Sequence, residues 1–390
     1  LFSQPEFEYI NALSAEEGFN LKYARRDVLP IISGNIINDE SLDRNINDLT
    51  SVRKRRDDSF DATIEINQTL YAGGALRAGI RAAKGRSENR YKEREKVISE
   101  LILEANNIYL DTANSSFILS YANNIFNILK PFKEKVDDRV KSGVMDPVEY
   151  ALFSVRLNNL ETKIYQLKSN SEKNKDRHRI FFKKNYEKLA FPLFFVGNDQ
   201  NYLKNNSYDV EMSELNFKEK KENIISVRSE YLPKFGVRAR YTKYDIDDDS
   251  NEDDIRGGIF FSMPIFSFGR GSAKINAAKA AAQSSENYID MSKKEDKINE
   301  SGLLSDFNNS LDNRNVYIRS YNDTLKQRKT LFDRLEISGF AINSLAEVML
   351  SEIRQLEILL NNESTIMSTY LSILHQNQTL NSEFKITLAR

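Results

Sequence analysis

The chain has 390 residues, 40% of them hydrophobic and 29% charged, with a formal net charge of −1. This even balance of charge removes the electrostatic argument for a nucleic-acid-binding protein, which needs a basic surplus. The absence of cysteine excludes disulfides, zinc–thiolate sites and cysteine nucleophiles, and the presence of only two histidines argues against His-based metal sites and Ser-His-Asp catalysis. We therefore expect no enzyme, no cofactor and no metal.

Two further expectations concern membranes and processing. No stretch approaches about 18 continuous apolar residues, so no transmembrane helix is expected. The first residue is Leu1 and not an initiator methionine, so we expect a processed or trimmed chain.

An internal repeat relates the two halves of the sequence. Leu70-Tyr71-x-x-Gly74 recurs as Ile265-Phe266-x-x-Gly269, a shift of 195 residues. A near-constant shift predicts a duplicated fold with residues 1–195 and 196–390 as its halves, because solenoid repeats are only about 20–50 residues long. The other matches are Gly143 with Gly339 and Leu160-Glu161 with Leu356-Glu357, both shifted by 196, and Leu29-Pro30 with Leu232-Pro233, shifted by 203.

The first half is expected to contain a helix that leads to Leu29-Pro30, then two strands, a long helix and a return helix. Residues 60–69 alternate between apolar and polar side chains, the period of a strand between two different environments. Pro131 is the one strong helix stop in the long segment that follows, and it should kink that helix. Gly143 supplies a turn, and Asp146-Pro147-x-Glu149 has the capping residues of a helix start. The expected elements are strands at about 31–38 and 60–70, a long helix at about 75–142 and a return helix at about 146–175.

The second half repeats this order. Residues 234–242 and 255–263 alternate in the same way, and the long segment after Gly269 contains no proline. Gly339 supplies the turn, and Ser344-x-x-Glu347 forms a capping box. The expected elements are strands at about 234–242 and 255–265, a long helix at about 270–338 and a return helix at about 344–385.

Two interpretations of the alternating strands remain open from the pattern alone. One is an antiparallel sheet with one face on a core; the other is a membrane barrel, whose strands need about 9–11 residues. The long polar loops at 39–59 and 244–254 favour the barrel. Four strands cannot close a barrel, and open edges are excluded from lipid, so several chains must contribute. The side chains expected to face the lumen are Asp61, Thr63, Glu65, Asn67, Lys234, Arg238 and Arg240.

The acidic loop at 244–254 has a second interpretation. Asp245, Asp247, Asp249 and Asn251 have the every-other spacing of a calcium loop, but Ser250 stands where the glycine of that motif belongs. A solvated loop is the preferred interpretation.

With these features the sequence resembles the TolC-like outer-membrane efflux and secretion channel family. The resemblance covers nearly the whole chain and lies in the two Leu-Pro pairs, residues 68–74 and 262–269, the alanine-rich run that follows, and the two tip glycines. It implies a mixed α and β fold with four antiparallel strands per protomer in the 12-stranded barrel of a homotrimer. Long coiled-coil-like helices would form a periplasmic α-barrel, with a small mixed equatorial segment at about 177–216.

The resemblance also implies a function, namely the exit duct of a tripartite efflux pump or a type I secretion system in a Gram-negative outer membrane. The periplasmic tip would dock an adaptor protein and, through it, an inner-membrane pump. The family's gate acids follow the second tip glycine by about six to nine positions, where Glu347 is the nearest match; Glu149 lies six after the first. Both are also capping residues, and the two roles are compatible. His178, in the equatorial segment, is interpreted as solvated or as an ordinary polar contact.

Two alternatives to the channel are a non-membrane coiled-coil scaffold and a periplasmic adaptor. A scaffold accounts for the helices but not for paired alternating strands 195 residues apart. An adaptor normally carries one helical hairpin per chain and lacks barrel strands.

Overall fold

The computed structural model describes residues 1–40, 58–184, 206–246, 252–338 and 342–386. The chain divides into two compact units, and each draws on both halves of the sequence. The sheet unit comprises residues 9–94 and 209–293; the hairpin unit comprises residues 1–8, 95–208 and 294–390. Neither unit coincides with one repeat, so the division at residue 195 stays an interpretation of the sequence.

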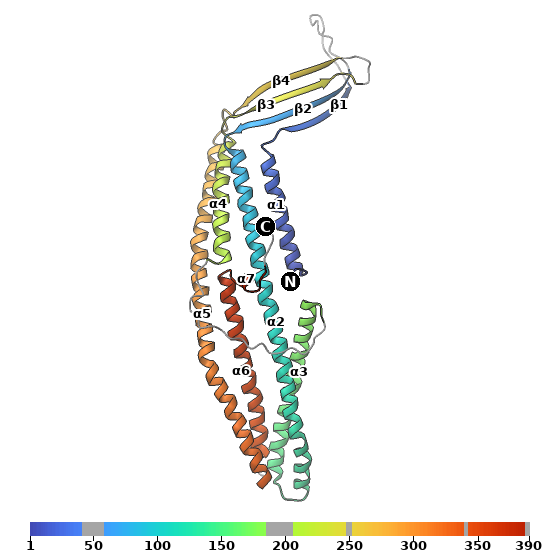
Figure 1. Ribbon diagram of the computed structural model, residues 1–390, viewed down its shortest axis with the longest axis vertical. Helices are drawn as coiled ribbons and strands as arrows, with labels where there is room; N and C mark the ends of the chain where they lie inside the picture. The colour runs from blue at the N-terminus through green and yellow to red at the C-terminus, as the bar shows by residue number, and fades with distance from the viewer. Residues whose placement is uncertain (41–57, 185–205, 247–251, 339–341, 387–390) are drawn as a thin grey trace. The chain divides into compact units, whose positions relative to one another are not determined.

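The sheet unit holds four antiparallel strands in the order β1-β2-β3-β4 (Figure 1). They are β1 (Ile31–Glu40), β2 (Asp58–Ala72), β3 (Lys234–Lys243) and β4 (Asp253–Ser262). Each neighbouring pair is continuous over about ten residues, with one irregularity in β2 between Thr69 and Tyr71. Among the described residues, β1 and β4 are the open edges of this sheet.

Helices α1 (Pro5–Arg26), α2 (Ala75–Lys141), α4 (Tyr208–Ser229) and α5 (Arg270–Ser338) contribute to the sheet unit. Ion pairs join them side by side. Arg86 of α2 pairs with Glu17 of α1 and with Glu219 of α4, each at 3.4 Å. Lys293 of α5 pairs with Glu214 of α4 at 3.2 Å.

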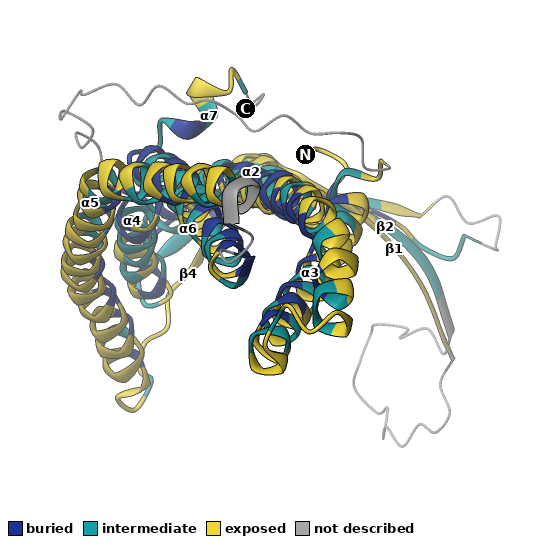
Figure 2. Ribbon diagram, turned by 90° about the horizontal axis from the view of Figure 1, so that it is seen from below, coloured by how far each residue is buried: buried dark blue, intermediate teal, exposed yellow. Residues whose placement is uncertain are grey.

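The hairpin unit contains the rest of α2 and α5 with α3 (Pro147–Phe182), α6 (Ile342–Gln376) and the short α7 (Leu380–Glu383). Its main core includes Ile125 and Leu129 of α2, Phe153 of α3, and Leu345 and Met349 of α6. Figure 2 shows α6 largely buried or half-buried, whereas α5 is largely exposed. Helices of this length are therefore held by packing of one face and not by an enclosing globular core.

The observed bounds differ from those expected at several elements. β4 ends at Ser262, before Pro264, and α3 continues to Phe182, so the start of the expected equatorial segment is helical. The end of the expected equatorial segment, from Tyr208, is the start of α4, and the middle of that segment lies outside the described residues. The return helix expected at 344–385 begins at Ile342 and ends at Gln376, followed by α7. Helix α2 continues through Pro131, as expected for the long helix at about 75–142.

Candidate functional site

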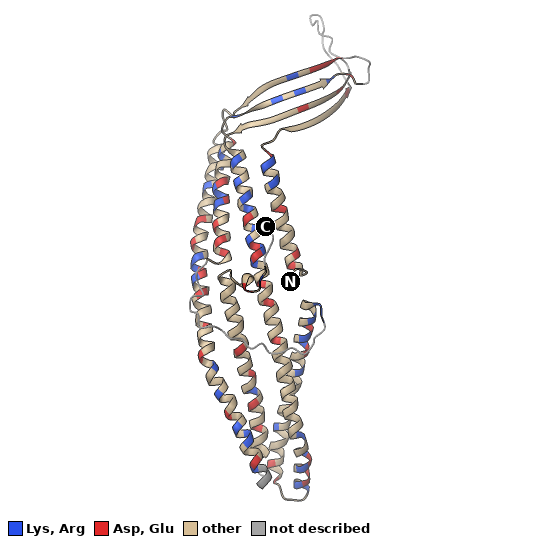
Figure 3. Cartoon of the chain, viewed as in Figure 1, with Lys and Arg blue, Asp and Glu red and all other residues tan. Residues whose placement is uncertain are grey.

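The strand register gathers the expected lumen residues on one face of the sheet. Glu65 of β2 lies opposite Arg240 of β3, and Asn67 lies opposite Arg238. Because cross-strand partners point to the same side of a sheet, these four side chains share one face. Thr63 completes it by approaching Thr242, with their hydroxyl oxygens 3.2 Å apart. β2 supplies acids and β3 supplies bases to this polar face (Figure 3).

A small network anchors the centre of the polar face. Arg238 Nε donates to Asn67 Oδ1 at 2.9 Å and lies 3.6 Å from Glu65 Oε1. Asn67 in turn donates to Glu65. The backbone N–H of Asp245 donates to Asp61 Oδ1 at 3.2 Å, so Asp61 holds the segment just after β3. Opposite charges on adjacent strands stabilise the pairing and leave a wettable surface.

Lys234 lies at the start of β3, opposite Ala72 and Ser262, and so stands apart from this network. The alternation of residues 255–263 places Phe260 on the polar face, but Phe260 was not among the expected lumen residues. Its ring lies 5.8 Å from the guanidinium of Arg238. A Cβ at Gly236 would meet that ring at 2.7 Å and Gln68 O at 2.2 Å, so only glycine fits beneath it. The sequence signal that could have identified Phe260 is a glycine on the neighbouring strand opposite an aromatic residue.

The opposite face of the sheet is apolar, and no described element covers it. Its side chains range from 36% exposed at Tyr241 to 82% exposed at Ile259. The other members are Ile32, Ile36, Ile64, Ile66, Val237, Ile255 and Phe261. A contiguous apolar surface of this kind marks a face that meets another apolar medium or partner.

The first helical turn-around, between α2 and α3, is built as the sequence predicts. Gly143 has a left-handed φ of 70°, and the N–H of Val144 bonds to Arg139 O at 2.9 Å. Asp146 is the N-cap of α3, because its Oδ1 accepts from the Val148 N–H at 2.8 Å, and Pro147 begins the helix. Glu149 lies in the first turn, where a negative charge favours the helix N-terminus.

The second turn-around differs from the expectation. Gly339 lies outside the described residues. Ser344 lies inside α6, which begins two residues earlier at Ile342, so Ser344 is not the N-cap and the expected capping box is wrong. Glu347 pairs instead with Arg156 of α3, at 2.8 Å. Asn343 donates to Glu149 O at 3.1 Å, so the starts of the two return helices lie beside each other.

A buried polar cluster further along the hairpin unit was not foreseen. Glu352 of α6 is 0% exposed; Tyr121 of α2 donates to its Oε1, and Arg328 of α5 lies 3.2 Å from the same atom. Tyr321 of α5 donates to Tyr121 at 3.1 Å. Burial raises the pKa of Glu352, partly offset by the bond from Tyr121 and the charge of Arg328. Glu352 lies on the inward face of the amphipathic helix α6, and the local sequence alone does not show that this position faces inward.

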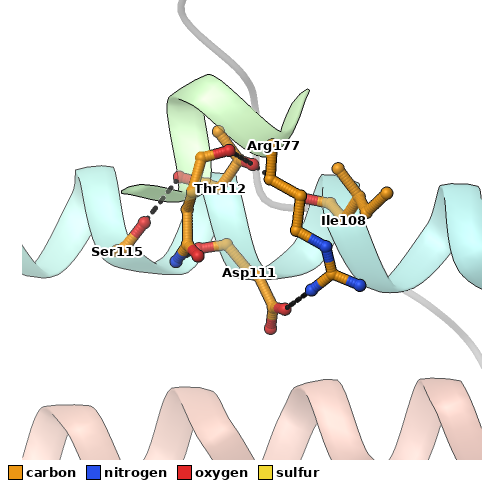
Figure 4. A network of polar contacts seen from close by, with 6 residues as sticks. Ile108, Asp111, Thr112, Ser115 and Arg177 are labelled. Carbon is orange, nitrogen blue, oxygen red and sulfur yellow. Dashed lines mark hydrogen bonds and ion pairs between the residues drawn. The ribbon is translucent and has the colours of Figure 1, made fainter. Parts of the chain in front are cut away.

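A second polar seam joins α2 to α3 (Figure 4). Thr112 Oγ1 lies 2.6 Å from Ile108 O, and it reaches across to Asn174 O at 3.2 Å. Asp111 pairs with Arg177 at 3.5 Å, and its pKa is raised because burial outweighs the charge of Arg177. Small side chains and cross-helix hydrogen bonds therefore fix the approach of the two helices.

His178, close to this seam, is 7% exposed, and its ring centroid is 4.6 Å from that of Phe182. Burial lowers its pKa. Of the two interpretations of His178, the solvated side chain is therefore wrong, and the ordinary polar contact stays a prediction.

None of the described helices is both long and apolar enough to cross a bilayer. Within the same described ranges, no group of three or more His, Asp or Glu side chains is arranged to hold a metal ion.

No protein-family model matches the sequence, and no curated protein matches it either. Solved structures do match. The CmeC outer membrane channel of Campylobacter jejuni is 14% identical, with 97% of this chain and 84% of that chain aligned at a TM-score of 0.85. The outer membrane protein VceC of Vibrio cholerae is 12% identical, over 96% of this chain and 93% of its own, at a TM-score of 0.80. The chain has the fold of these outer-membrane proteins.

A third structure, the MtrE outer membrane channel of Neisseria gonorrhoeae in its open state, is 15% identical over 96% of this chain and 86% of its own, with a TM-score of 0.70. The expected mixed α and β fold is thereby confirmed. At these identities the likeness extends to the fold alone, and the function is a separate question.

Proposed function

We propose that the protein is the exit duct of an export system in a Gram-negative outer membrane and that it conducts substrates passively from the periplasm to the exterior. The observation that carries this proposal is the uncovered apolar face of the sheet. Ile255 and Ile259 of the edge strand are 78% and 82% exposed, and Ile64 of the inner strand β2 is 53% exposed. Lipid is the medium that makes such a face favourable, since water penalises each exposed apolar side chain.

The polar face supports a hydrated pore. Asp61, Glu65, Arg238 and Arg240 lie on the side opposite the lipid-facing residues. Apolar-out and polar-in alternation over about ten residues is the pattern of barrel strands that enclose water. The two signs of charge compensate one another in the network around Arg238, so we expect weak charge selectivity from the duct itself.

The open edges β1 and β4 support assembly from several copies. Backbone groups at an edge have no hydrogen-bonding partner in hydrocarbon, so a four-stranded sheet cannot stand alone in a bilayer. We infer a homotrimer, in which three copies of four strands close a barrel of twelve. Outer-membrane lipid would surround this barrel.

The turn-arounds of the hairpin unit are the proposed periplasmic tip. Gly143, Asp146 and Glu149 lie at the turn-around before α3, and Ser344 and Glu347 lie in the first part of α6. Gly339 is assigned to the tip from the sequence alone. The pair between Glu347 and Arg156 ties α6 to α3, so it is a suitable lock that opens when the hairpins separate. A periplasmic adaptor that binds the open state more tightly would shift the equilibrium toward it, with an inner-membrane pump behind it. That pump would determine whether the duct serves drug efflux or type I secretion.

Two measurements on one preparation test the proposal. The mass of the detergent-extracted assembly should equal three chains, and the same material should form water-filled conductances in a planar bilayer. A water-soluble protein of one chain that never conducts would contradict the proposal and would favour the coiled-coil scaffold.

A further inference from the structure

The helices of the sheet unit carry a local excess of positive charge where they adjoin the strands. The segments at this level are residues 18–30, 73–86, 220–233 and 268–281, which comprise the end of α1, the start of α2, the end of α4 and the start of α5 with their turns. Together they contain thirteen Lys and Arg but only three Asp and Glu, although the whole chain has a net charge of −1. We call these thirteen side chains the basic collar (Figure 3).

The far ends of the strands have the opposite charge. β1 ends with Asp39 and Glu40, β2 begins with Asp58, and β4 begins with Asp253 and Asp254. The sheet therefore has an acidic boundary at one end and a basic boundary at the other, and its apolar face lies between them.

Two of the three acids in the collar segments already have partners within the sheet unit. Glu222 of α4 pairs with Arg81 of α2 at 2.7 Å, and Glu230, just after α4, pairs with Lys274 of α5 at 2.5 Å. These pairs join α4 to α2 and α5. The acids within the segments therefore neutralise only a small part of the positive charge of the collar.

Five exposed arginines of the collar have no ion-pair partner among the described residues, namely Arg25, Arg26, Arg77, Arg228 and Arg270. Three of them lie in the last turn of α1 or α4, where the helix dipole favours a cation. Arg77 and Arg270 lie in the first turns of α2 and α5, where the dipole disfavours a cation and where neither helix has an acid. Nothing within the described part of the chain accounts for these two arginines, so an anion from outside is required.

Aromatic side chains are interleaved with the cations at the same level. Phe19 and Tyr23 of α1 are 65% and 74% exposed, and Lys22 Nζ lies 5.1 Å from the ring centroid of Phe19. On the apolar face of the sheet, the rings of Tyr71 and Phe235 stack at 5.3 Å at the end that adjoins the helices. Aromatic rings mixed with Lys and Arg are typical of the boundary between a membrane and water.

We propose that the basic collar binds the headgroups of anionic phospholipids at the periplasmic boundary of the membrane. The inference rests on the proposed function, which places the sheet in lipid and the helices in the periplasm. A headgroup layer is about 5–8 Å thick on each side of a bilayer. Arg26 ends α1 just before β1, and Arg77 lies just after β2, so both lie at the level of that layer.

A second copy of the chain is a poor source of the required anion. It would present the same four basic segments at the same level, and its Glu222 and Glu230 would be engaged in the same pairs. An anionic cargo inside the pore is the other rival. The exposed aromatic side chains beside the cations favour a membrane boundary over a water-filled pore, whose lining is polar.

Tryptophan fluorescence tests the collar, because the chain has no tryptophan of its own. In the full chain, Tyr23→Trp places the reporter in the collar. Tyr241→Trp is the matched control, since it places the reporter on the apolar face near the acidic end of the strands. Each variant is reconstituted into phosphatidylcholine vesicles, and quenching by phosphatidylglycerol brominated close to its glycerol is compared with quenching by phosphatidylcholine brominated at the same place.

At position 23 the apparent affinity for phosphatidylglycerol should be about fivefold above that for phosphatidylcholine, the factor expected for one Lys or Arg at an anionic surface. This factor should fall toward one at about 1 M salt, where charges are screened beyond about 3 Å. At position 241 phosphatidylglycerol should have no advantage, because acids prevail at that end of the sheet.

Removal of charge from the collar should remove the preference. Arg26→Gln with Arg77→Gln and Arg270→Gln, added to Tyr23→Trp, should reduce the factor below about two. The control removes three exposed cations of the hairpin unit and should leave the factor unchanged. Its substitutions are Lys133→Gln, Lys168→Gln and Lys329→Gln.

Two results at position 23 would overturn the proposal. Equal quenching by the two brominated lipids at low salt would mean that lipid contacts the collar without recognition of its charge. Quenching by aqueous iodide and by neither lipid would mean that the collar faces water, as in a pore. In either case lipid quenching at position 241, with an assembly mass of three chains, would leave the proposed function standing; absence of lipid quenching at 241 would defeat both.

Discussion

Apolar side chains are exposed on one face of the four-stranded sheet but buried between the helices of the hairpin unit. In the hairpin unit Phe153, Leu160 and Met349 are all 0% exposed, because α2, α3 and α6 cover one another. In the sheet, Ile64 and Ile259 remain more than half exposed, because no described element covers that face. The helices therefore satisfy the hydrophobic effect within one chain, and the sheet needs something outside it.

Removal of a core side chain from the hairpin unit should have the largest effect. Phe153→Ala should destabilise the protein by about 3–5 kcal/mol, because it loses buried surface and leaves a cavity. Thermal unfolding followed by helical circular dichroism measures this. Val155→Ala, on the same helix but 55% exposed, is the control and should change little. Equal losses in the two variants would mean that α3 is not packed as described.

A charge on the apolar face of the sheet should come next. Ile259→Arg should cost about 2–4 kcal/mol if this position faces the middle of a bilayer, but almost nothing if it faces water. Urea titration of folding into lipid vesicles gives the value. Ser262→Arg, on the opposite face of the same strand, is the matched control. Equal tolerance of both arginines would remove the distinction between a lipid face and a lumen face.

The buried carboxyl of Glu352 should give a smaller, pH-dependent effect. Its pKa in the folded protein lies above the ordinary value of 4.5, so the folded state prefers the protonated form and loses stability as the pH rises above that value. Glu352→Gln mimics the protonated form. Its melting temperature should exceed that of the wild type at pH 8, and the gap should close toward pH 4.5.

The control for this variant is Glu363→Gln, which breaks the exposed pair with Arg314 at 2.6 Å. An exposed pair contributes little, so its melting temperature should follow that of the wild type at each pH. A gap for Glu352→Gln that widens toward acid would show that Arg328 and Tyr121 outweigh the burial of the carboxyl.

The smallest effect is expected from substitutions on the polar face, which should change the charge of the pore lining but not the stability of the protein. Arg238→Ala should shift the reversal potential of the conductance toward cations, and Glu65→Gln should shift it toward anions, because the two side chains belong to one network of opposite charges. Bilayer recordings in a salt gradient measure both. Shifts of the same sign would mean that this face does not line the ion path.

The sequence predicted well those features that depend on local period and on turns. Alternation over residues 60–69 and 234–242 identified both the strands and their faces, and Asp146-Pro147 identified the start of α3. Predictions from local patterns failed where a residue distant in the sequence determines the structure. Ser344 is a residue type typical of helix caps, yet α6 starts earlier. Glu352 looks like a surface acid in the sequence, but side chains of α2 and α5 contact it in the fold.

The solvated interpretation of His178 was also wrong, because its neighbours in sequence are charged and yet only 7% of the residue is exposed in the fold. The end of β4 differs in kind. Its residues have the repeat's strand signature, but the strand that would pair with them is not among the neighbours that one chain provides.

The most direct test of the lipid-facing sheet is a scan of single cysteines along β2, at Thr63, Ile64, Glu65 and Ile66, each labelled with a fluorophore in lipid vesicles. If one face meets lipid and the other meets water, labels at 64 and 66 should be quenched by a lipid-confined quencher and those at 63 and 65 by aqueous iodide. Quenching by iodide at all four positions would contradict the account.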